Sequence, residues 1–188
     1  MKKTKFNKID LINVAAIFVT ISSLCASVSW ISSSKAGGEA NDLKTAALGY
    51  MILRLESSTQ ASTELVQAQT YLTQAGMYFA EADAEDNSEL KSYLNDLGNQ
   101  SIEMSNYHTT VSVNLENRAQ NYYSNYSQTL DKATQFGNVA SLRSTGALIF
   151  TISAIVASIV GIFKRKEIMY VYFPIFIIAA SHLAISLI

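Results

Sequence analysis

Three long stretches without Asp, Glu, Lys or Arg constrain the fold more than any other feature of this sequence. They are residues 11–34, 144–163 and 168–188. A helix rises 1.5 Å per residue, so about 20 residues cross a hydrocarbon core of about 30 Å. The sequence therefore predicts an all-α membrane protein with three transmembrane helices.

The cations beside these stretches predict how the chain is oriented. Short segments rich in Lys and Arg remain in the cytoplasm. One such segment, residues 1–10, precedes the first stretch, and another, residues 164–167, joins the second to the third; their cations are Lys2, Lys3, Lys5, Lys8, Lys164, Arg165 and Lys166. We therefore expect a multi-pass protein of the cytoplasmic (inner) membrane, with residues 35–143 and the C-terminus outside.

Another interpretation treats residues 1–29 as a cleaved signal peptide. The basic start and the small residues Ser27 and Ser29 fit a signal peptide. However, the apolar stretch that begins at residue 11 is longer than the usual apolar region of such a peptide. We therefore favour a retained transmembrane helix.

The region between the first two stretches is polar and acidic. Residues 36–142 contain 13 Asp and Glu against 5 Lys and Arg, a formal charge of −8. The only proline of the chain, Pro174, lies elsewhere, so no strong helix breaker interrupts this region. The weaker signal "EADAEDNSEL" (81–90) predicts an extracytoplasmic helical hairpin with its tip near 82–88 and with Ser88 as the helix cap. The two helices would span about 10–82 and 88–163, unless Gly98 divides the second one.

Apolar and small residues recur in the hairpin at alternating spacings of three and four, as in a coiled coil. In the first helix this pattern runs from Leu48 to Phe79 through Leu55, Leu65 and Leu72; in the second it runs from Leu90 to Ala140, with a stutter after Leu115. Two helices with so few large apolar residues bury little surface alone. We therefore expect a coiled-coil-like hairpin that packs with other copies or with a partner.

Some residues strengthen this layout by resemblance. Lys35 and Ala36 follow the first stretch, Tyr50 comes a few turns later, and a Lys-Arg-Lys turn precedes the last stretch; "ALGYMILR" stands where a Trp-x-x-Tyr-Gln-Ala-Lys segment would be expected. In this layout the chain resembles a family of three-span membrane proteins known only as a domain of unknown function. The resemblance implies the topology and no activity.

Few residues indicate chemistry. The carboxylates at the hairpin tip, Asp83, Glu85, Asp86 and Glu89, are weak candidates for a cation site, but they lack the glycine of a calcium-binding loop. His108 falls in the predicted seam, where a buried hydrogen-bonded histidine that sets the register is the simplest interpretation. His182, in the third stretch, is interpreted as an interfacial or interhelical side chain. No metal, cofactor or catalytic residue is predicted, and no basic surface favours nucleic acid.

The remaining candidates concern assembly and modification. Tyr123 is predicted to lie off the seam, where it could contact a partner. Small residues in the second stretch, namely Ala154, Ala157, Ser158 and Gly161, would let another helix approach closely. Asn99 and Asn125 begin glycosylation sequons on the outward side.

The sequence thus favours a non-catalytic accessory or scaffold subunit. It would contact membrane lipid and form a homo-oligomer or join a larger membrane complex. The alternative is a sensor-like module whose ectodomain binds a ligand and signals through a partner. Because only about ten N-terminal residues and a short turn would lie in the cytoplasm, such a sensor would need another protein to carry its signal.

Overall fold

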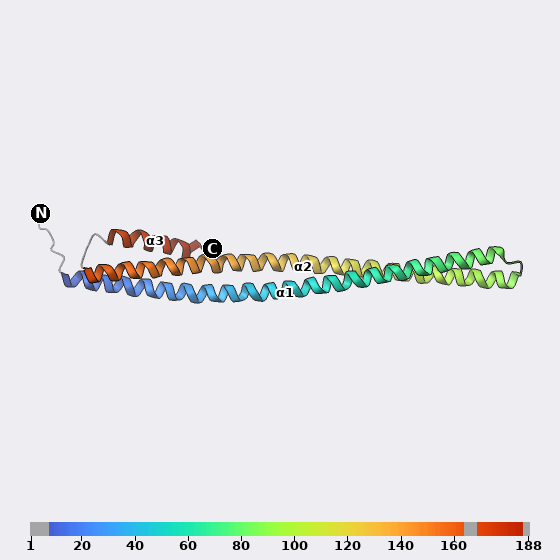
Figure 1. Cartoon of the computed structure of the whole chain (residues 1–188), viewed down its shortest axis with the longest axis horizontal. Coiled ribbons are helices and arrows are strands. Elements are labelled where there is room, and N and C mark those ends of the chain that lie inside the picture. The colour runs from blue at the N-terminus through green and yellow to red at the C-terminus, as the bar shows by residue number, and fades with distance from the viewer. Residues whose placement is uncertain (1–7, 164–168, 186–188) are drawn as a thin grey trace. The chain divides into compact units, whose positions relative to one another are not determined.

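The computed structural model describes residues 8–163 and 169–185, and all of these except a three-residue turn are helical. The helices are α1 (Lys8–Ala84), α2 (Ser88–Phe163) and α3 (Met169–Ile185), in the order shown in Figure 1. The predicted all-α class is therefore confirmed. The predicted basic turn at 164–167 lies outside the described residues.

The turn between α1 and α2 is held by the side chain of Asn87. Its Oδ1 accepts hydrogen bonds from the backbone N–H groups of Glu89 at 3.0 Å and of Leu90 at 3.3 Å. These N–H groups have no carbonyl partner within the first turn of a helix, so the side chain satisfies them. The predicted cap at Ser88 was wrong by one residue, because Ser88 is already the first helical residue.

Two of the helices meet the length and apolar composition needed to cross a membrane, namely α1 and α2. The apolar part of α3, Tyr170–Ile185, is shorter, with fewer than 18 residues. The prediction of apolar helices is thus confirmed for α1 and α2.

The chain divides into two compact units. Unit 1 comprises Met1–Lys44 and Asp131–Ile188, of which the described residues form a three-helix group. Its core contains Ala26, Phe150 and Ala179, one from each helix. A Cβ atom built on Gly146 would lie 3.7 Å from the carbonyl oxygen of Ala179. Figure 1 shows α3 alongside α2. Small residues therefore let α3 pack closely on α2.

Polar side chains in unit 1 point between its helices. The Ser22 and Tyr172 hydroxyls are 3.1 Å apart, and Ser33 donates to the Ala140 carbonyl at 2.8 Å. Ser22 and Ser29 are fully buried, whereas Ile31 is 72% exposed. Several hydroxyls of unit 1 thus lie between its helices, while many of its large aliphatic side chains point outward.

Unit 2, Thr45–Leu130, is a pair of helices that pack through small residues. In α1 a small residue is buried at almost every seventh position: Ala47, Ala61, Ala68, Ala75 and Ala82. The buried or half-buried small positions of α2 include Gly98, Ser101, Ser105, Ser112 and Ala119. Helices that meet through such side chains come closer than helices that meet through leucine.

This arrangement corrects two details of the predicted seam. In α1 the predicted leucines face outward, with Leu48, Leu55 and Leu72 between 58 and 62% exposed. In α2 the alternation of three and four continues without a stutter from Ser101 to Ala133, because Ser105 is buried whereas Met104 is exposed, and Ser112 bonds to α1. The largest side chains of α1 predict one heptad line, whereas small side chains on another line form its contact with α2.

Gly98 does not interrupt α2; it makes room for Phe79 instead. A Cβ atom built on Gly98 would lie 2.6 Å from the nearest atom of the Phe79 ring, which is closer than such atoms approach. The helix remains continuous because α1 covers this position, and a glycine costs a helix only about 1 kcal/mol relative to alanine.

A pair of substitutions tests this role. Gly98→Ala alone should gain little stability, because the methyl group must push the Phe79 ring away. In the Phe79→Ala background the same change should stabilise unit 2 by about 1 kcal/mol through helix propensity. The free energy of opening, measured by amide hydrogen exchange of the full chain in detergent, gives the four values of this cycle. Equal effects of Gly98→Ala in both backgrounds would contradict the steric role.

Candidate functional site: an outward seam of α1

The candidate functional site is a second, outward-facing line of residues on α1 in unit 2. Its members alternate at spacings of four and three, and every one is exposed: Leu48, Ile52, Leu55, Thr59, Ser62, Val66, Gln69 and Thr73. We call this line the outer seam. Its large members, Leu48, Ile52, Leu55 and Val66, are 59 to 65% exposed. Exposed apolar side chains that gather on one helix face indicate an interaction surface.

The two rows of the outer seam differ in shape. One row, Ile52, Thr59, Val66 and Thr73, is branched at Cβ throughout. The other row begins with Leu48 and Leu55 and continues with the smaller Ser62 and with Gln69. A β-branched residue at one core position and leucine at the other is the combination that favours two parallel strands in a coiled coil.

The threonines of the outer seam present no free hydroxyl donor. Thr59 donates to the Leu55 carbonyl at 2.8 Å, and Thr73 donates to the Gln69 carbonyl at 2.9 Å. Their methyl groups therefore complete the apolar row at little polar cost, since each donor is already satisfied within α1. The outer seam also contains no charged residue.

A shallow hollow lies beside Ile52. It is open to solvent, measures about 420 Å³, and is lined by Ala46, Gly49, Tyr50, Ile52 and Leu53. Its residues at positions 46, 49, 50 and 53 lie about one third of a turn from the outer seam, so the hollow is not part of that seam.

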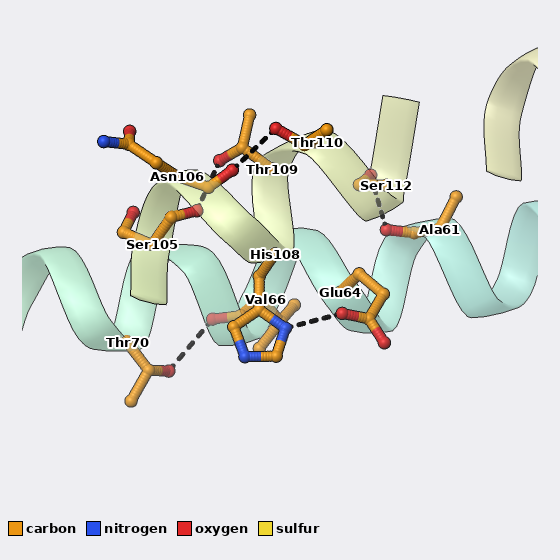
Figure 2. A network of polar contacts seen from close by, with 10 residues as sticks. All are labelled: Ala61, Glu64, Val66, Thr70, Ser105, Asn106, His108, Thr109, Thr110 and Ser112. Carbon is orange, nitrogen blue, oxygen red and sulfur yellow. Dashed lines mark hydrogen bonds and ion pairs between the residues drawn. The ribbon is translucent and has the colours of Figure 1, made fainter. Parts of the chain in front are cut away.

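A polar cluster in unit 2 joins α1 to α2 around His108 (Figure 2). His108 Nδ1 lies 2.6 Å from Glu64 Oε2, and the imidazole stacks on the Tyr71 ring at 5.4 Å between centroids. One turn away, Ser112 donates to the Ala61 carbonyl at 2.8 Å. The predicted hydrogen-bonded seam histidine is thereby confirmed. Glu64 was missed as its partner, because no sequence spacing links two residues across a hairpin.

The cluster joins the two helices through side-chain hydrogen bonds of His108 and Ser112. His108 and Glu64 are 13% and 26% exposed at their side chains. Across residues 8–163 and 169–185, no three His, Cys, Asp or Glu side chains gather in a way that could hold a metal ion.

The acidic tip residues stand apart from one another. Asp83, Asp86 and Glu89 are exposed, and Glu85 accepts a hydrogen bond from the Asn87 N–H at 2.9 Å. The structure thus uses Glu85 to shape the turn and leaves the other three carboxylates in solvent.

Other predicted residues have identifiable neighbours. Tyr123 is 46% exposed; the Arg54 guanidinium lies 4.6 Å from its ring centre, and the Tyr126 ring lies 6.2 Å away. Asn99 and Asn125 of the sequons are exposed. An exposed cation over an aromatic ring contributes about 0.5–1 kcal/mol, so Arg54 holds the Tyr123 ring in place.

The small residues of α2 in unit 1 face different surroundings. Ala157 is 2% exposed, and a Cβ on Gly161 would lie 3.4 Å from the Ala15 methyl of α1. Ala154 and Ser158 are half-buried, and Ser158 donates to the Ala154 carbonyl within α2. Gly161 therefore packs on a helix of the same chain.

Comparisons with known proteins find no matching protein family, no matching curated protein and no matching solved structure. The outer seam and the His108 cluster are accordingly interpreted from their own geometry.

Proposed function

We propose that this protein is a non-catalytic integral membrane subunit that serves as an accessory or scaffold in an assembly. Residues 11–34, 144–163 and 168–188 lie in the cytoplasmic membrane, and residues 35–143 lie outside it. The observation that carries the proposal is the outer seam. It is an uncharged, exposed heptad line on α1 that does not contact α2.

The surface of unit 1 supports insertion into lipid. Large aliphatic side chains point outward from all three helices, for example Leu24, Ile155 and Ile177, each between 55 and 61% exposed. Ser22 and Tyr172 place their hydroxyls between helices, and the exposed hydroxyls of Thr20, Ser27 and Ser181 donate to carbonyls of their own helix. Such a surface is unfavourable in water and suits a bilayer, where polar groups are satisfied within the protein.

The charges support the proposed orientation. The Lys-rich start and the Lys-Arg-Lys turn are both separated from the acidic region by one apolar stretch, so both belong on the cytoplasmic side. The acidic residues of unit 2 then lie outside. The resemblance in layout to three-span proteins agrees with this orientation.

Labelling of a single cysteine tests the proposal. In a Cys25→Ser background, Leu90→Cys places a thiol on an exposed residue near the hairpin tip. A membrane-impermeant maleimide should label it in intact cells, whereas Ile149→Cys, half-buried in unit 1, should react only after solubilisation. Labelling of residue 90 only after the cells are opened would overturn the orientation, and recovery of the chain in the soluble fraction would overturn membrane insertion.

A further inference from the structure

We propose that the outer seam of α1 binds the outer seam of a second copy of this chain, in a parallel, in-register pair about a two-fold axis. This inference rests on the proposed function, because it uses the membrane to fix the direction of both chains. It adds the identity of the partner and the residues in contact.

The spacing of the outer seam indicates that the partner is a helix. From Leu48 to Thr73 the exposed positions alternate between four and three residues without interruption. A line with a mean spacing of 3.5 residues runs straight along a supercoiled helix, so a second helix that supercoils with α1 can follow it over about seven turns.

The composition of the outer seam points to a second copy. A two-fold interface brings each residue against the same patch of its partner, so the patch must be self-complementary. An uncharged row meets itself without repulsion, whereas unit 2 as a whole is acidic, and the acidic tip at residues 81–89 lies beyond the end of the row. The alternation of β-branched residues with Leu48 and Leu55 is the one preferred by parallel pairs.

The membrane makes the pairing parallel and in register. Two copies that insert with the same orientation carry α1 in the same direction and at the same height above the bilayer. The outer seam of one copy therefore meets equivalent positions of the other, with Leu48 near Leu48 and Leu55 near Leu55. Gln69 would meet Gln69 in the same row.

The internal packing of unit 2 leaves α1 in need of this contact. Its inner seam buries alanines, which remove little apolar area, while the larger Leu48, Ile52, Leu55 and Val66 remain outside. Apolar burial stabilises by about 25 cal/mol per Å², so these exposed side chains contribute little to the stability of one copy. Pairing of two outer seams would bury these side chains.

Disulfide crosslinking in native membranes tests the pairing. Each variant carries one cysteine in the full-length Cys25→Ser chain, so any disulfide joins two copies. Leu48→Cys, Leu55→Cys and Ser62→Cys lie on one row of the outer seam. Leu53→Cys and Gln67→Cys are matched controls, since both residues are exposed on the same helix but lie about one third of a turn from the outer seam. We expect a dimer band for the first three variants and at least tenfold less for the two controls.

A further variant tests the energetics. Ser62 is the small member of its row, so Ser62→Leu should extend the leucine row and tighten the pair by about tenfold or more in dissociation constant, measured by dilution in detergent. Leu55→Glu should weaken it by a similar factor.

Several results would overturn the inference. They are equal crosslinking at residues 53 and 55, crosslinking to a different protein, and a chain that stays monomeric at every position. Each is read together with the labelling of residue 90, so that a correctly inserted chain without a dimer rejects the pairing alone. A chain that fails to insert rejects the proposed function itself.

Discussion

Replacement of Ala75 by leucine is expected to push the two helices of unit 2 apart and to lower its free energy of unfolding by about 1–3 kcal/mol. Ala75 is 1% exposed, and the nearest buried positions along α1, Ala68 and Ala82, are equally small. Three additional carbon atoms have no free space in such a seam, because the helices already approach closely. Amide hydrogen exchange of residues 45–130, in the full chain in detergent, measures the loss.

Ala46→Leu is the matched control for this prediction. Ala46 lies on the same helix but is exposed beside the open hollow, so the added side chain meets no neighbouring helix. Its free energy of unfolding should change by no more than about 0.5 kcal/mol. If both substitutions have the same small effect, the buried alanines do not set the distance between the helices.

The extent of the helices could be predicted from the sequence with good accuracy. Predicted ranges of about 10–82 and 88–163 compare with Lys8–Ala84 and Ser88–Phe163. The reason is physical: no proline falls in these ranges, and the cluster of Asp, Asn and Ser at residues 83–88 is the one concentrated turn signal between the apolar stretches.

The face of α1 that packs inward could not be predicted by the same reasoning. Large apolar residues usually mark the buried side of a helix, and Leu48, Leu55 and Leu65 obey a heptad pattern. A second heptad pattern of alanines lies beside it, however, and tight packing uses that one. The clue was available in the recurrence of Ala61, Ala68, Ala75 and Ala82, but one sequence does not show which of two patterns meets the second helix.

The His108 cluster shows a similar limit. A polar residue at a seam position predicts a partner across the hairpin, and His108 has one. Which residue of α1 lies opposite depends on the length of the turn and on the register of two helices of more than 70 residues. A change of one residue in the turn would bring a different side chain to the imidazole.

The second prediction with a large expected effect concerns this pair. Glu64→Leu and His108→Leu should each lower the free energy of unfolding of unit 2 by about 1–2 kcal/mol, because each leaves one half-buried polar partner without its hydrogen bond. The double variant Glu64→Leu/His108→Leu should recover most of that loss, because it leaves no polar group unpaired and its two leucines can pack on each other. Hydrogen exchange or thermal unfolding of the full chain provides the four values of the cycle.

Glu56→Leu separates the contribution of the pair from that of the charge. Glu56 is an exposed carboxylate on the same helix, and its contact with Gln60 is long, at 3.5 Å. Its removal should change the free energy of unfolding by less than about 0.5 kcal/mol. If the losses from Glu64→Leu and His108→Leu simply add in the double variant, the two residues act independently and the register of unit 2 is set by the alanine seam alone. A coupling of about 1 kcal/mol or more shows instead that the small residues determine how closely the helices approach, while the polar pair determines which turns face each other.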